Sequence, residues 1–220
     1  MKVINASYKI LNPVFDEPSF YPAYYYGLVE QAGRTCYKSE SLITDESAEK
    51  FVRNIIKNGH EAMLEHVSMT VKFIVDRGVS HEIVRHRLAS FAQESTRYCD
   101  YSKDKFDHSI TFIRPYYLRD KPSEAYSYWL NAMNKCEDMY FALMDAGCTP
   151  QEARAVLPNS TKTELIMTAN IREWRHFFKL RAAGITGKPH PQMLEVAVPL
   201  LKECINKLPA FFDDIIPMEV

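Results

Sequence analysis

Residues 67–75, Val-Ser-Met-Thr-Val-Lys-Phe-Ile-Val, place an apolar side chain at every second position. Successive side chains of a β-strand point to opposite faces, so this pattern predicts a strand with one buried face. Residues 161–169 alternate in the same way through Thr163, Leu165 and Met167. We expect both segments to belong to one sheet.

Helical patterns surround these two strands. Apolar spacing and capping signals predict helices over 45–58, 123–144, 150–157, 171–183 and 191–208. Thr149 and Glu152 form a capping box before the third helix, and Asn170 with Glu173 caps the fourth. Residues 1–10 and 108–114 are predicted to be further strands. Without a regular βαβ repeat, this order favours an α+β fold: a mostly antiparallel sheet packed with helices in a single domain over 1–220.

The composition is that of an ordinary globular protein, with 46% hydrophobic and 25% charged residues. There is no apolar run of about 18 residues and no secretory signal at the N-terminus, so we expect a cytoplasmic protein that does not bind membranes. The five cysteines form no C-x-x-C pair, which argues against a disulfide framework or a zinc ribbon. The seven glycines allow neither a dinucleotide-binding nor a phosphate-binding glycine loop.

The net charge of −1 hides two basic segments. Residues 85–97 hold three arginines against one glutamate, and residues 170–181 hold three arginines and one lysine against one glutamate. Two basic segments in an acidic background favour a focused anion site and argue against a broad nucleic-acid surface. Two solvated helix faces would explain the same charges.

The expected helix 171–183 has two contrasting faces at about 100° per residue. One face is cationic and contains Arg172, Arg175, His176 and Lys179. The opposite face contains Trp174, Phe177 and Phe178, and Arg181 falls on this apolar face. A guanidinium that faces a core needs an anion or several acceptors. Arg181 is therefore predicted to form a salt bridge with a buried carboxylate, to extend to solvent near the helix end, or to bind a polar ligand between aromatic walls.

A second cationic helix is expected to begin at Ser80 and to continue through Arg85-His86-Arg87. In such a helix Arg85 and Arg87 would lie about 200° apart, so they could not bind one small ligand from one face. Either the helix ends nearby, or the two arginines bind different ligands or subunits. Ser95 and Arg97 follow, and hydroxyl and guanidinium groups together suit a phosphate.

Arg85-His86-Arg87, seven further residues and then Ser95 resemble the RHR-x7-S signature of the flavin-dependent thymidylate synthases. Three other blocks resemble segments of this family in the same order. They are Asn58-Gly59-His60-Glu61 with Glu65-His66, Ala153-Arg154 with Leu157-Pro158, and Asn170-Ile171-Arg172 with Leu180-Arg181. The matching blocks span residues 58–181.

The resemblance implies a reaction and an assembly. The family transfers the methylene group of 5,10-methylenetetrahydrofolate to dUMP and reduces it with hydride from FAD, which NADPH has reduced; the product is dTMP. It implies a methyltransferase and oxidoreductase without a resident metal. It also implies a homotetramer whose active sites are shared between subunits, which would give Arg85 and Arg87 separate partners.

The resemblance also implies roles for individual residues. The FAD contacts would be His60, Ala62, Arg85, His86, Arg87, Gln93, Asn170, Arg172 and His176. The dUMP contacts would be Glu82, Arg85, Gln93, Glu94, Ser95, Thr96, Arg97, Arg154 and Arg181. Glu94 and Thr96 would act through backbone N–H groups, and Arg181 would polarise the uracil as the catalytic residue.

The sequence departs from the family pattern at three of these positions. Some members have Gln at the position of Glu82 and Glu at the position of Gln93, so the two residue types are exchanged here, and some have Asn at the position of His176.

Two other functions compete with this one. A phosphohydrolase with His86 as nucleophile would need a glycine after the Arg-His pair, which is absent. A non-enzymatic RNA- or nucleotide-binding module could use the same arginines and tyrosines.

Overall fold

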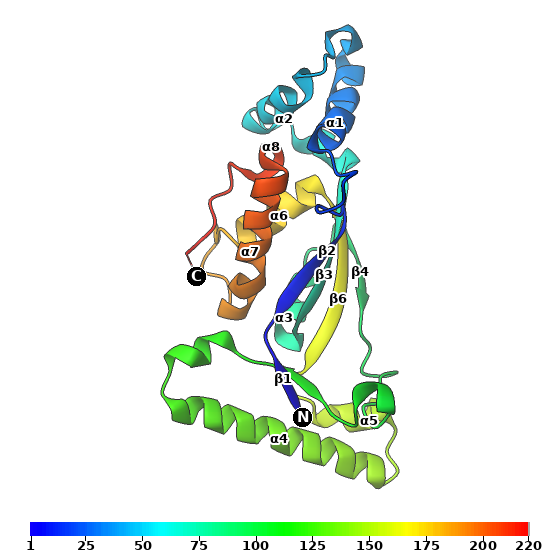
Figure 1. The fold of residues 1–220 in the computed structure, drawn as a ribbon, viewed down its shortest axis with the longest axis vertical. Coiled ribbons are helices and arrows are strands. Elements are labelled where there is room, and N and C mark those ends of the chain that lie inside the picture. The colour runs from blue at the N-terminus through cyan, green and yellow to red at the C-terminus, as the bar shows by residue number, and fades with distance from the viewer. Residues whose placement is uncertain (220) are drawn as a thin grey trace. The chain divides into compact units, whose positions relative to one another are not determined.

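The computed structural model describes residues 1–219 and contains a four-stranded sheet with the order β2-β3-β6-β4 (Figure 1). The strands are β2 (Ser7–Asn12), β3 (Ser68–Asp76), β6 (Lys162–Asn170) and β4 (Ala89–Gln93). A second, two-stranded sheet joins β1 (Lys2–Ile4) and β5 (Thr111–Ile113) in parallel.

The hydrogen bonds at the strand ends give the strand directions. Ile171, after the end of β6, donates to Val67 O before the start of β3 at 2.8 Å. Arg77, after the end of β3, donates to Thr161 O before the start of β6 at 3.1 Å. The two predicted strands are therefore antiparallel neighbours. Together with the helices, this confirms the predicted α+β class with a mostly antiparallel sheet.

The chain clusters into two compact units, and β3, β4 and β6 contribute residues to both. Unit 1 comprises residues 1–7, 73–85 and 91–166, and unit 2 comprises 8–72, 86–90 and 167–220. That residues 1–220 form one domain stays a prediction.

Unit 1 contains α3 (Arg77–Ile83), α4 (Ser123–Asp145) and α5 (Pro150–Ala153). Its core gathers Tyr101, Phe112, Met133 and Tyr140. The predicted capping box is present at α5, where the Thr149 N–H and hydroxyl each donate to Glu152 Oε2 at 2.7 Å. This box fixes the start of the segment that leads to Arg154.

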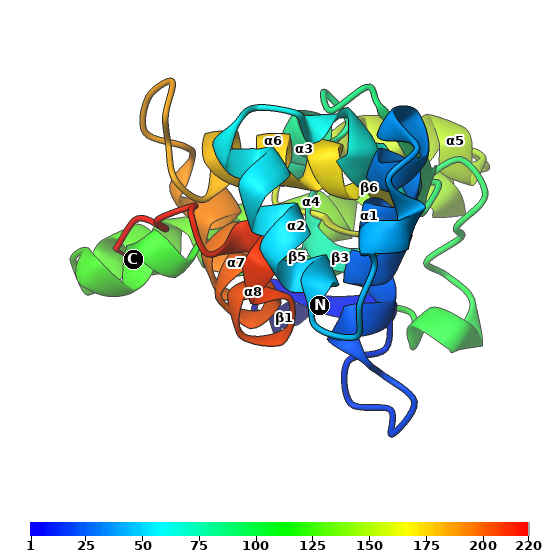
Figure 2. The same cartoon turned by 90° about the horizontal axis from the view of Figure 1, so that it is seen from above.

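Unit 2 contains α1 (Pro22–Tyr37), α2 (Ser47–Lys57), α6 (Ile171–Arg181), α7 (Pro191–Lys207) and α8 (Pro209–Phe212). The helix α1 packs against α2, and α6 against α7 (Figure 2). Trp174, Phe177 and Phe178 of α6 are fully buried, as their apolar face predicted. Asn170 Oδ1 accepts from Glu173 N at 2.9 Å, so the predicted cap of α6 is confirmed.

The expectation of a helix through Arg85-His86-Arg87 is wrong. The helix α3 is capped by Asp76, whose carboxylate accepts from Val79 N at 2.9 Å, and Ser80 lies inside it. It ends at Ile83, and the chain then enters β4; directly after this strand, Glu94 N donates to Glu164 O of β6 at 2.8 Å. Pairing with β6 therefore fixes a conformation that the local sequence does not indicate.

Within residues 1–219, every helix is too short or too polar to cross a membrane.

Candidate active site

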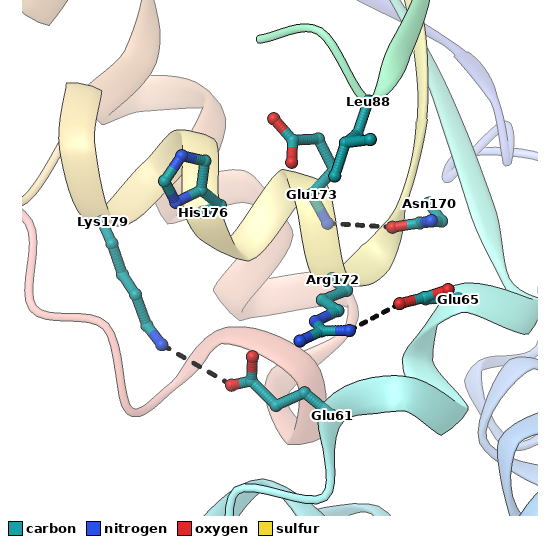
Figure 3. Close-up of a pocket in the computed structure, with 8 residues that line it drawn as sticks. All are labelled: Glu61, Glu65, Leu88, Asn170, Arg172, Glu173, His176 and Lys179. Atoms are coloured by element: carbon teal, nitrogen blue, oxygen red, sulfur yellow. Dashed lines mark hydrogen bonds and ion pairs between the residues drawn. The ribbon is translucent and has the colours of Figure 1, made fainter.

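A pocket of about 600 Å³ opens in unit 2 beside α6 (Figure 3). Its lining comes from the 3₁₀ helix Glu61–His66, from Leu88, from the end of β6 and from α6. The lining residues are Glu61, Glu65, Leu88, Asn170, Arg172, Glu173, His176 and Lys179. It brings together three of the residues predicted to bind FAD: Asn170, Arg172 and His176.

Ion pairs order the charged lining of this pocket. Arg172 pairs with Glu65 at 2.7 Å, and Lys179 pairs with Glu61 at 3.6 Å, as the dashed lines in Figure 3 indicate. Arg172 and Glu65 are about half exposed, so a ligand could exchange for this pair at little cost. Guanidinium, imidazole and amide groups on one open wall form a donor set that fits a cofactor with phosphates and ring acceptors.

His86 is buried beneath this wall, with 4% of its surface exposed. Its Nδ1 lies 3.1 Å from Glu173 Oε1, and its Nε2 accepts a hydrogen bond from Arg181 Nε at 3.2 Å. The ring also contacts Phe177, with 4.9 Å between centroids. Burial and the charges of Arg181 and His176 lower the pKa of His86 to about 4, so the ring is uncharged at neutral pH.

Arg175 corrects the predicted cationic face of α6. It is 1% exposed and therefore does not belong to a solvated face. Its guanidinium binds the two carboxylate oxygens of Asp214 at 2.6 and 2.7 Å, Glu61 Oε1 at 3.3 Å and the carbonyl of Phe211. Arg175 thus shows the arrangement that was one expectation for Arg181, a buried arginine with carboxylate partners.

A second pocket, of about 370 Å³, lies within unit 1. It is lined by Arg77, His81, Thr96, Arg154, Ala155 and Leu157. Arg154 Nη1 donates to Thr96 Oγ1 at 3.4 Å, so two residues predicted to bind dUMP meet here. Arg77 Nη1 is buried, and no hydrogen-bond partner for it lies among residues 1–219. An unsatisfied buried guanidinium nitrogen favours an anionic ligand at this wall.

Comparisons with known proteins identify the family. Residues 25–210 match the sequence model of a family described as "Thymidylate synthase complementing protein". A flavin-dependent thymidylate synthase of Geobacter sulfurreducens is 34% identical over 195 residues, covering 84% of this chain and 80% of that protein. One of Pyrococcus furiosus is 32% identical over 192 residues, covering 87% and 74%.

The chain belongs to the flavin-dependent thymidylate synthases. A solved structure titled a UMP/dUMP methylase, PolB from Streptomyces cacaoi bound with 5-Br dUMP, superposes with a TM-score of 0.78. It covers 97% of this chain and 96% of that chain at 21% identity, which supports a common fold.

The residues of the flavin-dependent thymidylate synthase signature differ in their exposure to solvent. His86 is buried, whereas Arg85 and Arg87 on either side of it are exposed. Ser95 Oγ accepts from Arg97 N at 3.2 Å, and Arg97 Nε donates to Gln151 Oε1 at 3.1 Å. Two exposed predicted FAD contacts, His60 and Ala62, lie just before and inside the 3₁₀ helix Glu61–His66.

Gln93 and Glu94, which are predicted to contact ligands, already have protein partners within unit 1. Gln93 Nε2 donates to Ser80 Oγ at 2.9 Å and to Thr163 Oγ1 at 3.2 Å. The N–H of Glu94 donates to a sheet carbonyl, and its carboxylate pairs with Lys162 at 2.9 Å. This gives Glu94 a structural role in the sheet, and its dUMP contact stays a prediction, as does that of Glu82.

Several residues of the candidate site received no functional role from the sequence, among them Glu61, Glu65, Arg77 and Glu173. Glu61 and Glu65 stand inside a block that resembles the family, so their position was available although no role was assigned to them. Arg77 gave no signal, because its place depends on the turn from β3 into α3. Glu173 was recognised only as part of the helix cap, while its side chain binds His86.

Proposed function

We propose that this protein converts dUMP to dTMP, with 5,10-methylenetetrahydrofolate as the carbon donor. Bound FAD, reduced by NADPH, supplies the hydride that completes the methyl group. The observation that carries the proposal is the position of Arg181. Its guanidinium is hydrogen-bonded to the buried, uncharged imidazole of His86, which belongs to the family signature.

The FAD site of the proposal is centred on the pocket beside α6. Asn170, Arg172 and His176 line it, and the remaining proposed contacts are His60, Ala62, Arg85, His86, Arg87 and Gln93. Both ring nitrogens of His86 have protein partners, so its contact with the cofactor would use the ring face or the backbone. These residues bind and orient the flavin.

The dUMP site of the proposal includes the pocket of unit 1. Ser95, Thr96, Arg97 and Arg154 hold the phosphate, and the buried Nη1 of Arg77 offers one further donor at the same wall. Glu82, Arg85, Gln93 and Glu94 complete the proposed dUMP contacts. Anchoring the phosphate with several guanidinium groups fixes the position of the uracil ring.

Arg181 acts on the uracil in this proposal. Its guanidinium stabilises the negative charge that develops on the base when C5 becomes nucleophilic. An oriented cation in a site with little water does this without reorganisation during the reaction. The hydrogen bond from its Nε to His86 fixes the plane of the guanidinium group.

The assembly in this proposal is a cytoplasmic homotetramer of single-domain chains, in which neighbouring subunits complete each site. The exposed Arg85 and Arg87 support it, because two guanidinium groups beside a buried histidine are available to ligands or neighbouring chains.

The test is a spectrum of the purified protein followed by reduction of its flavin and addition of dUMP with the folate. We expect a yellow protein whose reduced flavin is oxidised only when dUMP is present, with formation of dTMP. A colourless protein that shifts RNA in a gel would instead support the nucleotide-binding module.

A further inference from the structure

Glu173, His86 and Arg181 form a continuous hydrogen-bonded chain in unit 2. Glu173 Oε1 lies 3.1 Å from His86 Nδ1, and Arg181 Nε lies 3.2 Å from His86 Nε2. His86 and Glu173 are 4% and 6% exposed, so water does not compete strongly for either contact. The family resemblance assigned no role to Glu173.

The direction of every hydrogen bond in this chain follows from the arginine. A guanidinium only donates, so His86 Nε2 must accept and carries no proton. The single proton of the neutral ring therefore sits on Nδ1. This N–H points at Glu173, whose carboxylate oxygen accepts it.

The carboxylate of Glu173 has a local alternative that it does not use. In a capping box, a glutamate at this position of a helix reaches back to the backbone N–H of the N-cap residue. At α6 only the other half of that exchange is present, from Glu173 N to Asn170 Oδ1. The side chain instead binds His86, 87 residues away in the sequence.

A metal site is the competing interpretation of this cluster. His86, Glu173 and His176 offer ligand atoms within 4.8 Å of one another. However, Arg181 donates to the same imidazole, and a fixed positive charge at that distance disfavours a second cation. The hydrogen-bonded chain satisfies both ring nitrogens without an ion.

We propose that Glu173 is a positioning residue for Arg181. By holding the proton on His86 Nδ1, it keeps Nε2 as the acceptor that orients the guanidinium. Without this carboxylate the ring could carry its proton on Nε2, and two N–H groups would then face each other. The role in turnover rests on the proposed function, in which Arg181 polarises the uracil.

The first test measures the tautomer of His86 and needs no activity. Imidazole ¹⁵N NMR of the wild-type protein, assigned with His86→Gln, should show the proton on Nδ1 at neutral pH. Glu173→Met, which has a similar length and no acceptor, should introduce the Nε2–H tautomer. Glu173→Gln retains a carbonyl acceptor and should largely restore the Nδ1–H form.

The matched control is Glu30→Met. Glu30 is also buried in unit 2, at 1% exposure, and binds Arg34 and Ser47 away from the site. The Glu30→Met variant should be less stable than the wild-type protein, and the tautomer of His86 should be unchanged in it. A wild-type ring protonated on Nε2 or on both nitrogens overturns the proposal, as does a Glu173→Met ring that stays entirely in the Nδ1–H form.

The second test separates positioning from folding. Glu173→Met should lower kcat for dTMP formation about 10- to 100-fold, as loss of an orienting partner does elsewhere, with a smaller change in KM for dUMP. Because Glu173 also lines the proposed FAD pocket, kcat is expressed per bound flavin, and Glu173→Gln should recover most of it. Unchanged kcat despite a changed tautomer overturns the positioning role. A wild-type protein that makes no dTMP refutes the proposed function, while the NMR result still decides the tautomer.

Discussion

Arg181 is the residue on which the proposed chemistry depends. Arg181→Ala should lower kcat for dTMP formation about 10²- to 10³-fold, because one preorganised electrostatic contact to the developing charge is lost. Arg181→Lys should recover only part of this, because an ammonium group cannot hold two acceptors in one plane. The measurement is steady-state dTMP formation beside flavin reduction in the same preparation. Wild-type turnover in Arg181→Ala would refute the assignment.

His86 should make the stability of the protein depend on pH. Its pKa is about 4 in the folded protein and about 6.5 when unfolded, so the unfolded chain takes up a proton first as the pH falls. The folded state is therefore fully favoured above pH 6.5 and loses up to about 3 kcal/mol between pH 6.5 and 4. Arg181, His176 and Glu173 are the charged or titratable groups beside the ring.

The measurement for His86 is urea denaturation of the wild-type protein and of His86→Gln at several pH values. The wild-type free energy of unfolding should fall more steeply below pH 6.5 than that of the variant. Parallel pH profiles would show that the ring is not held neutral by its surroundings.

At the scale of the helix α6, Arg175 is a structural arginine. Arg175→Met should lower the free energy of unfolding by about 3 kcal/mol, because it leaves Asp214 without its cation and Glu61 with Lys179 alone. Arg53→Met is the matched control, since Arg53 also binds two carboxylates but is 42% exposed; it should cost less than about 1 kcal/mol. Equal losses in denaturant titrations of the two variants would contradict the burial argument.

The cap of α5 connects helix stability to the phosphate site. Thr149→Ala removes the hydroxyl of the capping box and should cost about 1 kcal/mol of unfolding free energy. Arg154 follows within the same short segment, so the affinity for dUMP should fall as well. Thr35→Ala, at an exposed threonine inside α1, is the control and should change neither quantity. Calorimetric titration with dUMP beside thermal denaturation tests both effects.

Elements with local signals could be predicted from the sequence, and those fixed by distant contacts could not. The α5 box, the Asn170 cap and the alternation in β3 and β6 are each written in a few neighbouring residues. The strand β4 depends on its pairing with β6, some 70 residues away, as in the hydrogen bond from Glu94 N to Glu164 O. The periodicity of α6 predicted its aromatic face, but it could not indicate that Asp214 would bury Arg175.

The candidate site was predictable to a similar extent. The family motifs indicated Asn170, Arg172 and His176, and these three residues do line one pocket. The contacts of Arg172 with Glu65 and of His86 with Glu173 were not predictable, because each joins residues far apart in the sequence, 107 and 87 positions respectively. A motif identifies chemically useful groups, whereas packing decides which of them are charged and how they are oriented.

At the scale of the whole molecule, Arg87 should connect flavin binding to assembly. Its guanidinium is exposed beside the buried His86, so it is available to a cofactor phosphate or to a neighbouring subunit. Removing it should leave the fold of one chain intact, because an exposed arginine contributes little to stability. Arg87→Ala should therefore have a lower flavin content, or an assembly that dissociates at a higher protein concentration. Its affinity for dUMP should change less.

The experiment for Arg87 compares three quantities in one preparation of each protein. Flavin absorbance per chain gives cofactor occupancy, light scattering after size exclusion gives the oligomeric state, and calorimetry gives the affinity for dUMP. Arg119→Ala is a suitable control, because Arg119 is also exposed but lies in unit 1 outside the proposed site. If the flavin site is completed by neighbouring subunits, occupancy and oligomeric state should fall together in Arg87→Ala. A monomer that keeps its full flavin would refute the shared site, because a single chain would then bind the cofactor alone.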